Sequence, residues 1–153
     1  MSGQFRVTIW DPTLIIAQII AVQSLFYLSY GFLLTCASSL LGANASLTNV
    51  FNYDVVNVSK GFLSISCYIV NSLAGAGTLW IIVRRTKQCL DFTVTCYGFH
   101  LLFCWLYNGY FPSLISWWLV TLAGISIMCV SAEFLCLKTE LEDIPLLGAR
   151  IQV

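Results

Sequence analysis

Three stretches of this sequence contain no Asp, Glu, Lys or Arg, and they constrain the fold more than any other feature. They cover residues 12–53, 61–83 and 92–132, which are 42, 23 and 41 residues long. A helix needs about 20 apolar residues to cross the hydrocarbon core of a bilayer, which is about 30 Å thick. The middle stretch therefore has the length of one crossing helix, and each outer stretch is about twice as long as one crossing needs.

The composition agrees with a membrane environment. Hydrophobic residues make up 59% of the chain and charged residues only 9%, whereas an average soluble domain has about 25% charged residues. Seven basic and seven acidic residues are too few to solvate a fold this small. Disorder requires high net charge and nucleic-acid binding requires a basic surface, but the formal net charge is zero. We therefore expect an integral membrane protein that contacts the lipid bilayer and no nucleic acid.

Polar segments divide the two outer stretches. Asn, Ser and Thr dominate residues 44–49, a composition typical of loops. Asn108–Pro112 is a turn signal, because proline cannot extend the preceding helix. The sequence predicts a single all-α transmembrane domain (1–153), a bundle of four transmembrane helices over 13–41, 61–83, 91–107 and 113–137, with loops at 42–60 and 84–90 and a tail at 138–153.

The basic residues predict the orientation of the bundle. With four spans, both termini lie on the same side of the membrane. Only Lys60 then lies on the opposite side, and the residues that share the side of the termini are Arg6, Arg84, Arg85, Lys87, Lys138 and Arg150. Because basic residues are enriched in cytoplasmic loops, we expect the termini and loop 84–90 in the cytosol and loop 42–60 on the non-cytosolic side.

The ionisable residues at and within the spans form the candidate site. An ionisable group inside a membrane is costly and therefore marks a function by default. Asp91 opens the third span, and His100 lies about 13.5 Å deeper along the same helix. The cluster comprises Arg84, Arg85, Lys87, Asp91, His100 and Glu133. The favoured interpretation is structural, with the arginines neutralising the carboxylates and clamping three spans together. The alternative is a polar pocket, open to the cytosol, that binds a partner.

The remaining motifs predict no chemistry of their own. The seven cysteines form no CxxC pair and have no histidine at zinc spacing, so no metal site is expected. Cys89 and Cys136 lie near the cytosolic interface, where we favour simple packing over palmitoylation. Asn44 and Asn57 are N-glycosylation acceptors in the non-cytosolic loop, and we expect them to stay mostly unmodified so close to the membrane. No nucleophile has a recognisable base, so the sequence predicts no enzyme and no cofactor.

Several short segments, spread over nearly the whole chain, resemble one family. They are Gly3–Arg6, Trp10–Pro12, Lys87–Thr95, Phe99–Leu102, Phe111–Ser113, Trp117–Val120, Thr139–Leu141 and Ile144–Leu146. In this order and at this length, the chain resembles the Sys family of Golgi trafficking proteins, which are small four-span membrane proteins. Loop 42–60 and the end of the tail look less like the family.

The resemblance implies a multi-pass protein of the Golgi membrane, at the trans-Golgi network. It also implies that the protein recruits an Arf-related small GTPase, through the acetylated N-terminus of that GTPase, and so supports endosome-to-Golgi transport. Asp91 and Glu133 are then the expected binding residues, with Arg84, Arg85 and Lys87 around them.

Two alternatives from other classes stay open. A small transporter or channel would need polar residues through the full depth of the membrane, and the non-cytosolic half lacks ionisable ones. A purely structural bundle would shape the Golgi membrane and bind no GTPase. The sequence leaves open whether the chain forms homo-oligomers.

Overall fold

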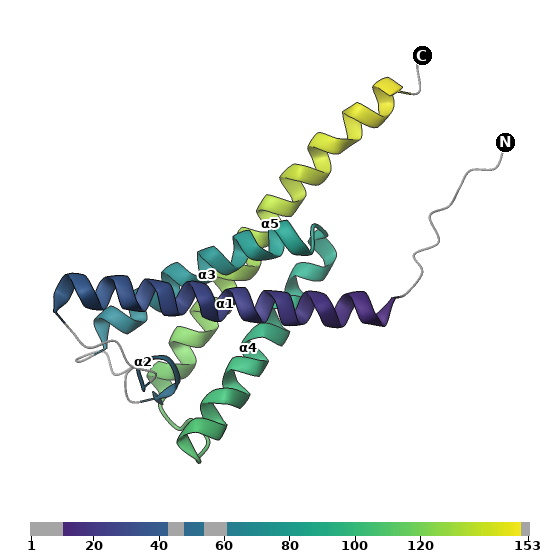
Figure 1. Cartoon of the computed structure of the whole chain (residues 1–153). Helices are drawn as coiled ribbons and strands as arrows, with labels where there is room; N and C mark the ends of the chain where they lie inside the picture. Colours follow the sequence, from purple (N-terminus) through teal and green to yellow (C-terminus); the bar gives the residue numbers. More distant parts are fainter. Residues whose placement is uncertain (1–10, 43–47, 54–60, 151–153) are drawn as a thin grey trace.

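The computed structural model describes residues 11–42, 48–53 and 61–150, with residues 142–150 described for their backbone only. Five helices follow one another in this part of the chain: α1 (Pro12–Leu41), α2 (Thr48–Phe51), α3 (Phe62–Ile82), α4 (Thr86–Asn108) and α5 (Ile115–Arg150). Four of them, all but α2, are long and apolar enough to cross a membrane, α5 over Ile115–Leu141. The described residues contain no strand, so the predicted all-α membrane bundle is confirmed (Figure 1).

The ends of α1 follow from its local sequence. Asp11 precedes the helix, and its carboxylate accepts hydrogen bonds from the backbone N–H groups of Thr13 at 3.1 Å and Leu14 at 3.4 Å. Pro12 occupies the first helical position, where its missing N–H costs nothing. At the other end Gly42 has a φ of 65°, a left-handed conformation that glycine adopts without strain. The Asp-Pro start and the glycine stop therefore set the length of this helix.

Two helices extend beyond the spans that the sequence predicts, and a short helix lies within a predicted loop. Helix α4 begins at Thr86, before the predicted start at Asp91, and α5 continues to Arg150 instead of ending at residue 137. The extra part of α5 contains three leucines and two glutamates, which favour helix in water as well as in lipid, but also Pro145 and Gly148, which do not. The short helix α2 lies inside the stretch predicted as a loop.

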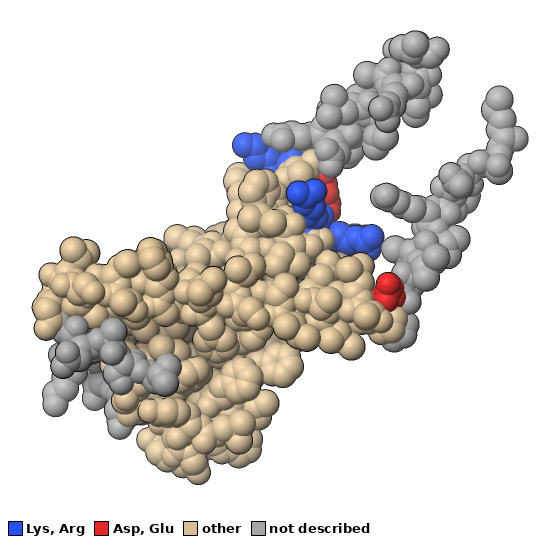
Figure 2. Space-filling model, in the orientation of Figure 1, with Lys and Arg blue, Asp and Glu red and all other residues tan. Residues whose placement is uncertain are grey.

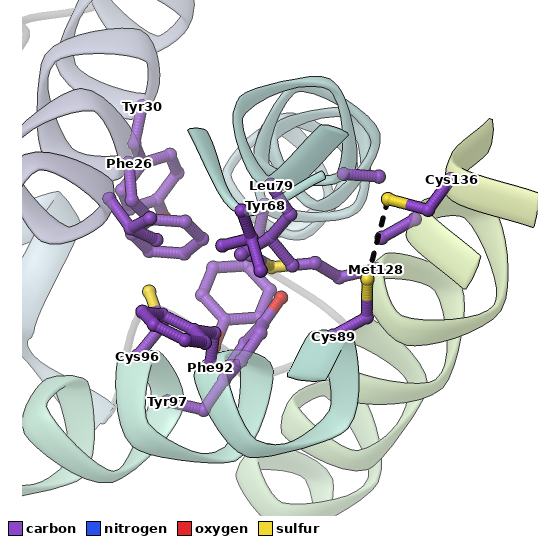
Figure 3. Packing of buried hydrophobic residues seen from close by; sticks show 14 of the residues in the cluster. Phe26, Tyr30, Tyr68, Leu79, Cys89, Phe92, Cys96, Tyr97, Met128 and Cys136 are labelled. Atoms are coloured by element: carbon purple, nitrogen blue, oxygen red, sulfur yellow. Dashed lines mark hydrogen bonds between the residues drawn. The ribbon is translucent and has the colours of Figure 1, made fainter. Parts of the chain in front are cut away.

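Helix α3 is the central element of the bundle. It packs against both α1 and α5, while α5 also packs against α4. Figure 3 shows side chains from all four long helices meeting in one buried cluster, among them Phe26, Leu79, Tyr97 and Met128. Helices α3 and α5 come close together at Gly75, where an added methyl carbon would lie 2.9 Å from the Met128 sulfur. Helices α1 and α4 contact each other much less than these pairs do.

The small residues of α3 face this cluster on one side only. Ser72 and Ala76 are buried, while Ala74 and Thr78, at the same spacing, are not. The first pair therefore marks the face on which α3 packs against its neighbours, as small residues do in membrane bundles.

Buried polar side chains in the bundle bond to one another. Asn71 is fully buried, and its amide donates to the Phe26 carbonyl oxygen at 3.2 Å while its oxygen accepts from the Ser29 hydroxyl. The hydroxyls of Ser72 and Tyr97 lie 2.8 Å apart. The membrane interior contains no water that could hydrogen-bond an unpaired polar group, so breaking these bonds is costly. The bonds therefore hold α1, α3 and α4 together.

The two ends of the bundle differ in charge. We call one the basic end; it is formed by the start of α1, the turn between α3 and α4, and residues 138–141 of α5. The side chains of Lys, Arg, Asp and Glu gather there in Figure 2, and the rest of the described surface in this view is uncharged. We call the other the loop end; it is formed by α2 and the turn at residues 109–114. The predictions for Arg6, Asn44, Asn57 and Lys60, and for the side chain of Arg150, fall outside the described residues.

Candidate functional site

The predicted cluster is spread over the structure rather than gathered at one point. Arg84, Arg85, Lys87 and Asp91 are exposed at the basic end. Within the described part of the chain, none of these four, nor Glu133, is recorded in an ion pair. The structure therefore does not bring the arginines and carboxylates into a clamp between spans.

The turn between α3 and α4 holds its two arginines outward. Arg84 has a φ of 54°, the one non-glycine residue with a positive φ in the described residues. Its backbone N–H bonds to the Leu79 carbonyl oxygen at 3.3 Å, which closes the end of α3. Arg85 follows in an extended conformation and offers no side-chain cap to α4. The start of α4 therefore needs a hydrogen-bond acceptor from elsewhere.

Helix α5 supplies that acceptor. The carboxylate of Glu140 accepts from the backbone N–H of Thr86 at 3.1 Å, in the first turn of α4. One residue earlier, the hydroxyl of Thr139 accepts from the indole N–H of Trp80 at 2.8 Å. A carboxylate at a helix N-terminus is stabilised by the unpaired N–H groups and the helix dipole. These two contacts, which the sequence did not indicate, join the ends of α3, α4 and α5 at the basic end.

Glu133 lies among thiols instead of cations. It is half-buried, and its carboxylate accepts from the Cys129 thiol at 3.4 Å. On the same seam between α4 and α5, the sulfur atoms of Cys89 and Cys136 are 3.6 Å apart and buried (Figure 3). Glu133 is seven residues before Glu140, or about 10.5 Å deeper along α5. A carboxyl at this depth has only weak donors beside it.

His100 lies far from the basic end, in the interior of the bundle. Its side chain is 2% exposed, and its Nδ1 is 3.1 Å from the hydroxyl of Tyr27. Its Nε2 is 3.5 Å from the Cys104 sulfur, one turn along α4. Both ring nitrogens are thus engaged: Nδ1 in a contact between α1 and α4, and Nε2 in a contact within α4. Among the described residues, no three His, Cys, Asp or Glu side chains come close enough together to hold a metal ion.

A groove between α1 and α4 lies near the basic end. It is a shallow, open depression lined by Ile19, Val22 and Gln23 from α1 and by Phe92, Thr95 and Cys96 from α4. This is the seam where the two helices make few contacts. The depression encloses no cavity, so another molecule could contact it only from the surface of the bundle.

Gln23 is the polar group of this groove. Its buried carboxamide makes no hydrogen bond of standard geometry to a described residue, although the Tyr27 hydroxyl lies beside it. The hydroxyl of Tyr27, one turn further along α1, is turned to His100. Gln18, by contrast, donates to the Ile82 carbonyl oxygen at 3.2 Å and fixes α1 to the end of α3. Gln23 lies about 7.5 Å deeper than Gln18. The sequence shows both glutamines as polar interruptions of the first span, but it gives no sign of which one faces a groove.

Comparison with known proteins identifies the family. Residues 5–146 match the SYS1 family, described as integral membrane protein S linking to the trans Golgi network. The chain is 45% identical over 146 residues to a protein SYS1 homolog from Nematostella vectensis, covering 94% of this chain and 92% of that protein. It is 36% identical over 144 residues to a protein SYS1 homolog from Dictyostelium discoideum, covering 93% of this chain and 62% of that protein. No solved structure matches the chain.

The family match confirms the resemblance carried by the short segments, and it covers all four membrane-spanning helices. The family description is that of an integral membrane protein and concerns the trans-Golgi network. The chain belongs to the SYS1 family and is an integral membrane protein linked to the trans-Golgi network.

Proposed function

We propose that this protein recruits an Arf-related small GTPase to Golgi membranes, and that the groove between α1 and α4 receives the acetylated N-terminus of the GTPase. The observation that carries the proposal is the buried carboxamide of Gln23, which lines this groove and makes no hydrogen bond of standard geometry. The partner comes from the resemblance, and the carboxamide supports this groove as its binding site.

The chemistry of the groove suits an acetylated, apolar N-terminal segment. A glutamine carboxamide both donates and accepts hydrogen bonds, so it can pair with the amide that acetylation creates. Ile16 and Ile20 of α1 are 57% and 60% exposed beside the groove and offer apolar contacts. A single weak anchor holds a protein on a membrane only marginally. A groove that adds contacts within the membrane therefore lengthens the residence of the GTPase.

The experiment measures the Golgi-to-cytosol ratio of the GTPase in cells that lack this protein. We expect the GTPase to become cytosolic and to return when the wild-type chain is expressed. Gln23→Leu removes the carboxamide, and Thr95→Trp fills the groove; both are expected to reduce the recovery. Thr35→Val is the matched control, because Thr35 is exposed near the other end of α1 and its hydroxyl bonds to its own helix.

Two results would count against parts of the proposal. A GTPase that stays on the Golgi without this protein would exclude the receptor function. If the GTPase is released but both groove variants restore it fully, the groove is not the site. Reversing the charges of Arg84 and Arg85, and changing Glu133 to Gln, would then test the remaining candidates at the basic end.

A further inference from the structure

We propose that a hollow at the loop end binds the polar end of an uncharged membrane lipid that carries a hydroxyl group. The hollow shares no lining residue with the groove near Gln23, so the proposal does not depend on the recruitment of a GTPase.

The hollow is built from every helix of the described chain. Its cavity volume is about 20 Å³, enough for one water-sized group such as a hydroxyl. Tyr30 of α1, His100 of α4 and Trp117 of α5 form aromatic walls, and Val50 of α2 adds an apolar contact. Because α2, which lies at the loop end (Figure 1), belongs to the lining, the hollow lies at this end of the bundle.

Three hydroxyl-bearing side chains lie in this hollow although they are more than nine-tenths buried. Ser64 is 7% exposed, and Tyr68 and Thr121 are each 6% exposed. The Tyr68 hydroxyl has no hydrogen bond of standard geometry to any described residue, although Thr121 lies beside it. A buried hydroxyl without a partner costs free energy in a membrane protein. A ligand that supplies the partner recovers this cost.

The lining also defines the charge of the ligand. None of the described residues that line the hollow is Asp, Glu, Lys or Arg. A phosphate or ammonium group would lose its hydration there and gain no opposite charge, which is strongly unfavourable. The ligand is therefore neutral, with one or two hydrogen-bonding groups next to an apolar body that packs on the aromatic walls.

The depth of the hydroxyls points to a lipid. Tyr68 is six residues from the start of α3, and Thr121 is six residues from the start of α5, so each lies about 9 Å inside the loop end. This is the region where headgroups give way to acyl chains. Sterols, ceramides and diacylglycerols share the required chemistry, which is an uncharged polar end with a hydroxyl group on an apolar body.

The test uses the purified full-length protein in phosphatidylcholine vesicles. Each vesicle sample contains one photoactivatable, clickable probe: a sterol, a ceramide, a diacylglycerol or, as the charged reference, a phosphatidylcholine. We expect at least one of the three hydroxyl lipids to label the segments around Tyr68 and Thr121, as mapped by mass spectrometry, and to be displaced by its unlabelled form. Which probe labels identifies the lipid class.

Two variants test separately whether binding needs the Tyr68 hydroxyl and whether it needs the empty space of the hollow. Tyr68→Phe removes the hydroxyl and should reduce labelling about two- to tenfold, the range expected for one lost hydrogen bond. Thr121→Leu fills the hollow and should abolish labelling. Ser66→Ala is the control, because Ser66 is exposed on α3 and its hydroxyl bonds to its own helix.

The proposal is overturned if the phosphatidylcholine probe labels these segments as strongly as the hydroxyl lipids. It is also overturned if Thr121→Leu keeps the labelling unchanged. The melting temperature of each variant in detergent is measured alongside. If Thr121→Leu is as stable as the wild type and no probe labels either protein at the hollow, the space is a packing void and not a lipid site.

Discussion

At Gly124, α5 comes so close to α3 and α4 that no side chain fits. A methyl carbon added there would lie 2.7 Å from the Tyr97 hydroxyl, 3.1 Å from the Ser72 hydroxyl and 3.2 Å from a ring carbon of Tyr68. Since Tyr97 and Ser72 bond to each other, neither can move away freely. Because the side chain of Gly124 is only a hydrogen atom, α5 can pack directly against the hydrogen bond between Ser72 of α3 and Tyr97 of α4.

We therefore expect Gly124→Ala to lower the free energy of unfolding by about 1–3 kcal/mol, the usual cost of overpacking. Thermal unfolding in detergent measures it. Gly77→Ala is the matched control, because no described atom lies within 4 Å of the added carbon and alanine favours helix more than glycine does. If both alanine variants unfold at the same temperature, the close approach at Gly124 is not a determinant of stability.

Asn71 makes a second prediction at this scale. Its carboxamide bonds to both the Phe26 carbonyl and the Ser29 hydroxyl and so connects α3 to α1. Polar contacts between membrane helices contribute about 0.6 kcal/mol on average and up to about 1.7. Asn71→Ala should lower the free energy of unfolding by a value near the upper figure, because two bonds are lost. Thr78→Ala, whose hydroxyl bonds to its own helix, should leave it unchanged.

At the scale of the elements, Glu140 controls where α4 begins. Its carboxylate caps the N-terminus of α4 from a different helix. Glu140→Ala should cost about 1 kcal/mol and fray the first turn of α4. Hydrogen exchange at the amides of residues 86–90 should rise severalfold, and Lys138→Ala should not change it, because Lys138 is exposed. Unchanged exchange in the Glu140 variant would mean that the turn between α3 and α4 holds α4 without this cap.

The sequence predicted the number and the order of the membrane helices because one effect dominates their placement. Charged residues are excluded from the bilayer core, so charge-free stretches of sufficient length become spans. The true starts and ends depend on contacts outside the core. The start of α4 at Thr86 relies on Glu140, which is 54 residues away in the sequence.

The contacts between helices could not be predicted in the same way. Helices surrounded by lipid are apolar on all sides, so hydrophobicity does not mark the face that packs. The positions of charged residues in the sequence predicted how deep Glu133 and Asp91 lie along their helices. They did not predict which side of the helix each side chain faces. The structure places Glu133 beside Cys129 and leaves Asp91 exposed. The groove at Gln23 was missed for the same reason.

For the whole molecule, the gathering of charged residues at one end predicts the orientation. Arg84, Arg85, Lys87 and Lys138 are exposed at the basic end together with the start of α1. We therefore expect both termini in the cytosol. In cells whose plasma membrane alone is permeabilised, antibodies should reach tags at either terminus, and a tag inserted in loop 42–60 should react only after the Golgi membrane is permeabilised. The opposite pattern would reverse the assignment of the two ends.

The length of α1 has a consequence for where the protein resides. Its 30 residues span about 45 Å, whereas the hydrocarbon core is about 27 Å thick in the endoplasmic reticulum and about 32–33 Å in sterol-rich plasma membrane. The helix must tilt in either membrane, and it tilts less in the thicker one. Hydrophobic mismatch of this kind sorts proteins along the secretory route. The length of α1 therefore favours the later, thicker compartments of this route.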